Sequence, residues 1–210
     1  KYAIQNLIQK CHDLEFGQLL LQSAFRESIR LKKEAISILL LKEGKANIEI
    51  ASEFNENEVE SVLTCACEFG NVAIIDTLLA EGANVNCNDK WGNGESCIVI
   101  AARGGFVDIV KKLLKSGKVD IDKRTTNNNT ALLIACEKGR LDVVQVLLEA
   151  KANTIIVNML GKSAMDMASS YPDAEIATKI KELLNHYTPK EKVDRSAVDD
   201  EDWGIVNKVI

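Results

Sequence analysis

A pattern that recurs about every 34 residues limits the possible folds of this chain more than any other feature of its sequence. Four copies begin at a serine or threonine: Ser61, Ser96, Thr130 and Ser163. Successive starts are 35, 34 and 33 residues apart, and the copies share an order of small, glycine and apolar positions. Such a period in three or more copies is typical of a solenoid whose units pack only against their neighbours.

Each copy predicts two short helices joined by a tight turn. The initial serine or threonine can cap the first helix through its side-chain oxygen. A recurring alanine such as Ala66 allows close helix packing, and a glycine such as Gly70 ends the first helix in a left-handed conformation. The second helix carries one apolar stripe, which in the first copy is Ile74, Ile75, Leu78 and Leu79. Polar stretches rich in Asn and Gly between the copies predict β-turns.

These residues resemble the ankyrin repeat, whose unit reads roughly D-x-x-G-x-T-P-L-H-x-A-A-x-x-G-H, then a leucine-rich helix, then G-A-D-V-N. Residues 82–86, 89–92 and 161–168 carry the match, and the resemblance covers about residues 55–184. It implies an all-α solenoid of about five helix-turn-helix units with a row of β-turn fingers. The proline and histidine of the motif are replaced in every copy, so we expect lower local stability than in a consensus array.

The chain divides into three parts under this interpretation. Residues 1–54 form an N-terminal capping helix and a degenerate unit, in which a short insertion separates helices near residues 19–24 and 35–41. Residues 55–184 are the ankyrin repeats, and residues 185–210 are an acidic and apolar C-terminal tail.

The tail joins an acidic run, residues 199–202, to an apolar segment that begins at Trp203. We expect this segment to fold back on the last unit; it could instead start another domain or be a motif for another protein. The chain begins at Lys1, so we also expect it to be a piece of a longer protein.

Charge and cysteine spacing exclude several classes of function. A formal net charge of −5 gives no general attraction to nucleic acid. No apolar run approaches the ~20 residues of a membrane span. The six cysteines include no Cys-x-x-Cys pair, and the two histidines are far apart, so we expect neither a metal nor a cofactor. Reduced, buried thiols are expected at four packed positions, which indicates an intracellular protein of the cytoplasm or nucleus: Cys65, Cys67, Cys97 and Cys136.

No catalytic set is present in the sequence. His12 and His186 lack a nucleophile and an orienting group that the sequence places nearby, so we expect no enzyme. Lysines 111, 112, 115 and 118 form a basic run on a second helix, which is typical of a solvated outer face.

In the ankyrin family, fingers and the exposed side of the first helices carry protein recognition. The resemblance therefore implies a monomeric adaptor or scaffold that binds another protein. The alternative is a regulatory or targeting segment of a larger enzyme, channel or host-directed effector. Trp91, on the finger that we expect to be longest, either packs on its neighbour or anchors a partner. The partner-binding candidates are Lys90, Trp91, Asn93, Glu95, Arg103, Thr126, Asn127, Asn129, Glu137, Lys138, Met159, Leu160 and Lys162, with Glu68 at another helix end.

Overall fold

The computed structural model describes residues 17–43, 46–52, 55–88 and 93–187, and within them ten helices and one two-stranded sheet. The first helices of the units are α2 (Gly17–Arg30), α4 (Val62–Glu68), α6 (Cys97–Gly104), α8 (Ala131–Glu137) and α10 (Ala164–Ser169). The second helices are α3 (Glu34–Lys42), α5 (Val72–Ala80), α7 (Val107–Lys115), α9 (Leu141–Glu149) and α11 (Ala174–Tyr187). The strands are β1 (Glu49–Ser52) and β2 (Asn55–Ser61).

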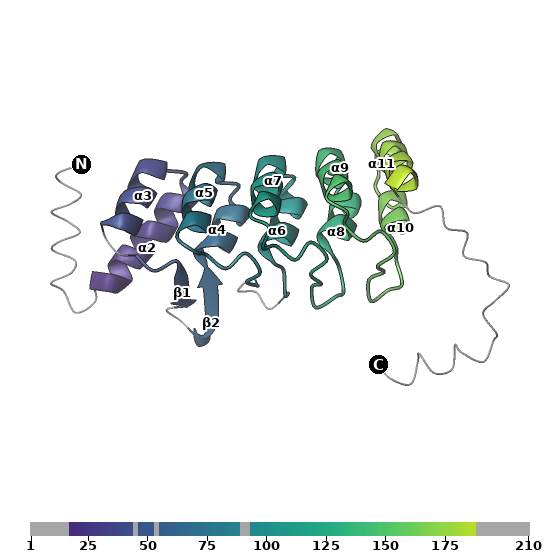
Figure 1. Ribbon diagram of the computed structural model, residues 1–210. Helices are drawn as coiled ribbons and strands as arrows, with labels where there is room; N and C mark the ends of the chain where they lie inside the picture. The colour runs from purple at the N-terminus through teal and green to yellow at the C-terminus, as the bar shows by residue number, and fades with distance from the viewer. Residues whose placement is uncertain (1–16, 44–45, 53–54, 89–92, 188–210) are drawn as a thin grey trace.

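The helices stack in two rows, and the loops between units project from one edge of the stack (Figure 1). Each first helix packs on its own second helix and on the first helix of every described neighbouring unit. We call the projecting loops finger 1 (residues 46–61), finger 2 (83–96), finger 3 (118–130) and finger 4 (152–163). The predicted all-α solenoid of about five helical units is confirmed.

The inner first helices are buried on nearly every side because neighbouring units cover both flanks. All six residues from Ala131 to Cys136 in α8 are buried, and Ala135 has no exposed surface. The predicted caps are present at three helix starts. The Ser61 hydroxyl accepts a hydrogen bond from the Leu63 N–H, the Thr130 hydroxyl from the Leu133 N–H, and the Ser163 hydroxyl from the Asp166 N–H. Short helices without strong intrinsic stability are thus held by packing and caps.

The glycine turn after each of α4, α6 and α8 meets two requirements. Gly139 has a φ of 63°, and a Cβ there would lie 2.3 Å from the ring of Tyr171 in the next unit. In the first unit Lys32 adopts the same left-handed conformation, with a φ of 55°. Its turn closes with the bond that the glycine turns make, from the Lys33 N–H to the Ser28 carbonyl. The predicted insertion between these two helices is therefore wrong, because α2 continues to Arg30 and the turn has the ordinary length.

Finger 1 is a β-hairpin that the sequence analysis did not predict. Strands β1 and β2 pair antiparallel, with Glu49 opposite Ser61. From Ala46 to Ser61 is 15 positions, whereas 13 separate Ala83 from Ser96 in finger 2. The expectation that the finger of Trp91 is the longest is therefore wrong.

The thiols lie where the repeat pattern puts them. As predicted, four thiols are buried and form no disulfide: Cys65, Cys67, Cys97 and Cys136. Burial raises the pKa of the Cys136 thiol to about 12, so that thiol stays protonated and inert at neutral pH. Cys87 is only partly buried, and its sulfur lies 3.6 Å from that of Cys97.

Candidate functional site: the finger ridge

The tips of fingers 2, 3 and 4 are joined by hydrogen bonds. The N–H of Thr126 donates to the Asn93 carbonyl at 3.0 Å, and the N–H of Met159 donates to the Asn127 carbonyl at 3.1 Å. The side-chain amide of Asn128 adds a bond of 2.8 Å to the Val157 carbonyl. We call this continuous surface the finger ridge, made of residues 93–95, 124–129 and 155–162.

The bases of the same fingers are also linked. The Asn86 side-chain oxygen accepts a hydrogen bond from the Asp120 N–H at 2.9 Å, and the Asp122 carboxylate accepts one from the Asn153 N–H at 2.9 Å. Asn86 also donates to the Lys118 carbonyl. Because each finger is fixed to the next at both base and tip, the ridge has a defined shape before any partner arrives.

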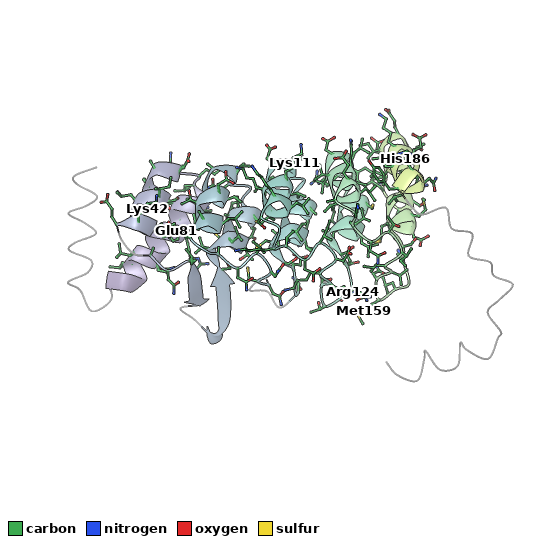
Figure 2. The ribbon with its side chains drawn as sticks, viewed as in Figure 1. Lys42, Glu81, Lys111, Arg124, Met159 and His186 are labelled. Carbon is green, nitrogen blue, oxygen red and sulfur yellow. The ribbon has the colours of Figure 1, made fainter. Side chains whose placement is uncertain are left out.

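A buried asparagine shapes the tip of finger 4. Asn158 is 8% exposed, and its side-chain oxygen accepts hydrogen bonds from the N–H groups of Leu160 and Lys162, each at 3.0 Å. The turn that results points Met159 and Leu160 outward, with exposed fractions of 71% and 79%. Figure 2 shows Met159 and Arg124 at the same edge of the array, opposite Lys111. The tip thus presents apolar and cationic chemistry on a fixed backbone.

Glu95 has a different role from the one the sequence suggested. It was expected on the surface, but it is 8% exposed because its carboxylate turns toward Arg103 at the end of α6. Arg103 donates to one carboxylate oxygen at 3.0 Å and ion-pairs with the other. Since 43% of the Arg103 side chain is exposed, Glu95 orients a guanidinium that a partner can reach.

The other candidates differ in exposure. Thr126 and Asn127 are exposed and Asn129 is half-buried, with its N–H donating to the Thr125 hydroxyl. At the end of α8, Lys138 is exposed and lies 3.2 Å from the half-buried Glu137. Lys162 and Glu68 are exposed as well, and Lys90 and Trp91 lie outside the described residues.

Three ridge residues were missed from the sequence. Arg124 is exposed at the base of the finger 3 tip, where its guanidinium donates to the Asn128 side chain. Ile155 and Val157 on finger 4 are 74% and 42% exposed. The sequence did contain a signal for Ile155 and Val157, because the corresponding positions of the other fingers carry polar residues such as Asp122 and Arg124.

The described residues contain no cluster of three or more His, Cys, Asp or Glu side chains placed to hold a metal. His186 contacts the ring of Tyr187 edge-on, with centroids 5.1 Å apart. Within the same described ranges, no helix is both long and apolar enough to cross a membrane.

Stacked helix pairs with a linked row of exposed turns define a helical-repeat protein, a class whose repeats form an extended binding surface. The sequence profile of the family described as ankyrin repeats (3 copies) matches residues 63–158 and 98–196. The chain belongs to the ankyrin-repeat family, and the predicted family is confirmed. A comparison with curated proteins found no match.

Proposed function

We propose that this chain is a protein–protein interaction module that binds its partner through the finger ridge and the exposed ends of the first helices. The observation that carries this proposal is the hydrogen-bonded connection of three finger tips, which holds exposed side chains in fixed positions. Ankyrin repeats are generally non-catalytic binding modules, in agreement with this role.

The chemistry of the ridge supports a protein partner. Met159, Leu160 and Arg124 of the ridge offer apolar area and directed donors for carboxylates or carbonyls, and Arg103 at the end of α6 offers further donors. Little conformational entropy is lost on binding when the backbone is already ordered. Lys90 and Trp91 remain proposed contacts on finger 2.

A second use of the same ridge is regulatory or targeting, in which the partner is another part of a larger enzyme or channel, or a host protein. The observations on the ridge apply to both. We favour a monomeric adaptor or scaffold, because each described unit has its neighbours within the chain. Free, buried thiols support an intracellular location.

The test compares the two edges of the array. Partners are captured with the purified chain, and the affinity of each is measured by titration calorimetry for Arg103→Ala, Leu160→Ser and Lys111→Ala. Truncating a ridge residue that anchors a partner should cost about 2 kcal/mol or more, roughly a thirtyfold loss of affinity.

Lys111 is the matched control because it is exposed on α7 at the opposite edge (Figure 2). It is a better control than Lys112, which ion-pairs with Asp76 of the neighbouring unit. Loss of binding in Lys111→Ala with full affinity in both Arg103→Ala and Leu160→Ser would place the site on the outer helices and reject the proposal.

A further inference from the structure

The last unit closes the helix stack with polar residues. Asp166 and Ser169 of α10 stand 33 positions after Leu133 and Cys136, the corresponding residues of α8. Leu133 and Cys136 are at most 1% exposed because α10 covers them, whereas Asp166 and Ser169 are exposed. A terminal repeat needs a polar outer face, because no further unit covers it. The outer face of α10 meets this need, so it is poorly suited to pack against another helix pair.

Finger 4 shows the opposite change. Ile155 stands 33 positions after Asp122, whose carboxylate accepts a hydrogen bond from the next finger. Leu160 likewise corresponds to Asn127 of the finger before it. The carboxylate that joins finger 3 to finger 4 and the polar side chain at the tip have thus both become apolar at the end of the row. Four large apolar side chains of this finger are exposed, namely Ile155, Val157, Met159 and Leu160.

This combination restricts the occupant of the surface. An exposed apolar group of this kind marks an interaction site. The polar face of α10 disfavours a further repeat, so the surface fits a short apolar segment that lies along the finger alone. Exposed cations flank it at Arg124 and Lys162, while the neighbouring Asp166 carboxylate is engaged by Ser163. The segment should therefore carry negative charge beside its apolar residues.

The chain itself contains a segment of this composition. Residues 199–202 are four consecutive carboxylates, and Trp203, Ile205, Val206, Val209 and Ile210 follow them. The geometry points to docking of residues 199–210 on finger 4, with the apolar residues against the exposed side chains and the carboxylates beside Arg124 and Lys162.

The chain is long enough for this contact. Trp203 lies 16 positions after Tyr187, the end of α11, which at ~3.3 Å per residue gives a reach of roughly 50 Å. The path from α11 to finger 4 crosses two helices of ~10 Å and one finger of ~20 Å, about 40 Å in all. The docked tail would cover part of the finger ridge and compete with a partner there.

Fluorescence of Trp203 tests the docking directly. In the full chain with Trp91→Phe, Trp203 is the single tryptophan. Docking predicts emission at shorter wavelength than in the urea-unfolded chain, together with protection from acrylamide quenching. Adding Leu160→Ser should lower the ratio of docked to free tail by roughly tenfold, the factor that burial of a leucine side chain provides, and Lys162→Glu should lower it less.

Leu31→Ser is the matched control, because Leu31 is 51% exposed at the other end of the array. It should leave the Trp203 emission unchanged, and circular dichroism verifies that each variant is folded. Trp203 emission like that of the unfolded chain would overturn the inference. The inference would also be overturned if the protection of Trp203 from quenching rose with protein concentration and the protein had the mass of a dimer. The tail would then bind a second copy of the chain.

Discussion

Leu133 and Leu160 have the same side chain and opposite surroundings. Leu133 is 1% exposed, in α8 between the first helices of two neighbouring units, whereas Leu160 is 79% exposed at the tip of finger 4. The helix layer is held by apolar burial, and the finger layer is held by hydrogen bonds that leave side chains such as those of Met159 and Leu160 exposed. The difference teaches that stability and recognition lie in separate layers of this array. Substitutions in the helix layer should therefore change the free energy of unfolding, and substitutions in the finger layer should change partner binding.

The largest expected difference is between alanine substitutions of these two leucines. Leu133→Ala removes a buried side chain and should lower the free energy of unfolding by about 2–5 kcal/mol. Leu160→Ala should change it by less than about 0.5 kcal/mol, as for most surface substitutions. Urea unfolding followed by circular dichroism measures both. Equal losses of unfolding free energy in the two variants would show that the helix layer does not hold more of the stability than the finger layer.

A smaller effect is expected for Asn158, which belongs to the finger layer and is nevertheless buried. Asn158→Ala removes the acceptor for the N–H groups of Leu160 and Lys162 and should cost about 1–3 kcal/mol. The loss should be local to finger 4. Hydrogen exchange should therefore accelerate at these two amides and stay unchanged in α8, and a uniform increase along the array would contradict the prediction.

The smallest effect concerns pH. Hydrogen bonds from the Ser163 hydroxyl and backbone hold the pKa of Asp166 below its usual value. A lowered pKa in the folded state means that the contribution to stability is present above the unfolded pKa, about 3.9, and is lost as pH falls through the folded value. The stability difference between the native chain and Asp166→Asn should thus shrink below about pH 4. A difference that grows on acidification would contradict this assignment.

The repeat, its helices and the burial of its cysteines could be predicted from sequence because each recurs at a fixed spacing. The turn at Lys32 could not, since a lysine replaces the glycine that normally signals a left-handed residue. Ser28 stands at the position of α2 where the other units have alanine, so the first unit could not be aligned with them by sequence. Its hydroxyl is buried and satisfied by the Phe25 carbonyl at 2.6 Å and by Ser37 at 2.8 Å.

The candidate site was less visible in the sequence than the fold. Glu95 was placed on the surface because the ankyrin resemblance puts recognition on the fingers. Its burial depends on Arg103, eight positions later on a different element. The apolar side of finger 4 becomes informative only when Ile155 is set beside its counterpart Asp122. Such comparisons need the pairing between fingers, which residue spacing alone does not give.

The hydrogen bonds between fingers also have a mechanical consequence. The finger tips are tied by main-chain hydrogen bonds and the bases by bonds between side chains and main chain, each of about 1 kcal/mol. At the outer edge the described contacts between units are packed helices and the Lys112–Asp76 ion pair. Side chains can slide, but the tie between Met159 and Asn127 must break before those fingers separate. The array should therefore bend with the finger edge keeping its length while the edge of the second helices stretches. A pulling force should separate neighbouring second helices before it separates the fingers.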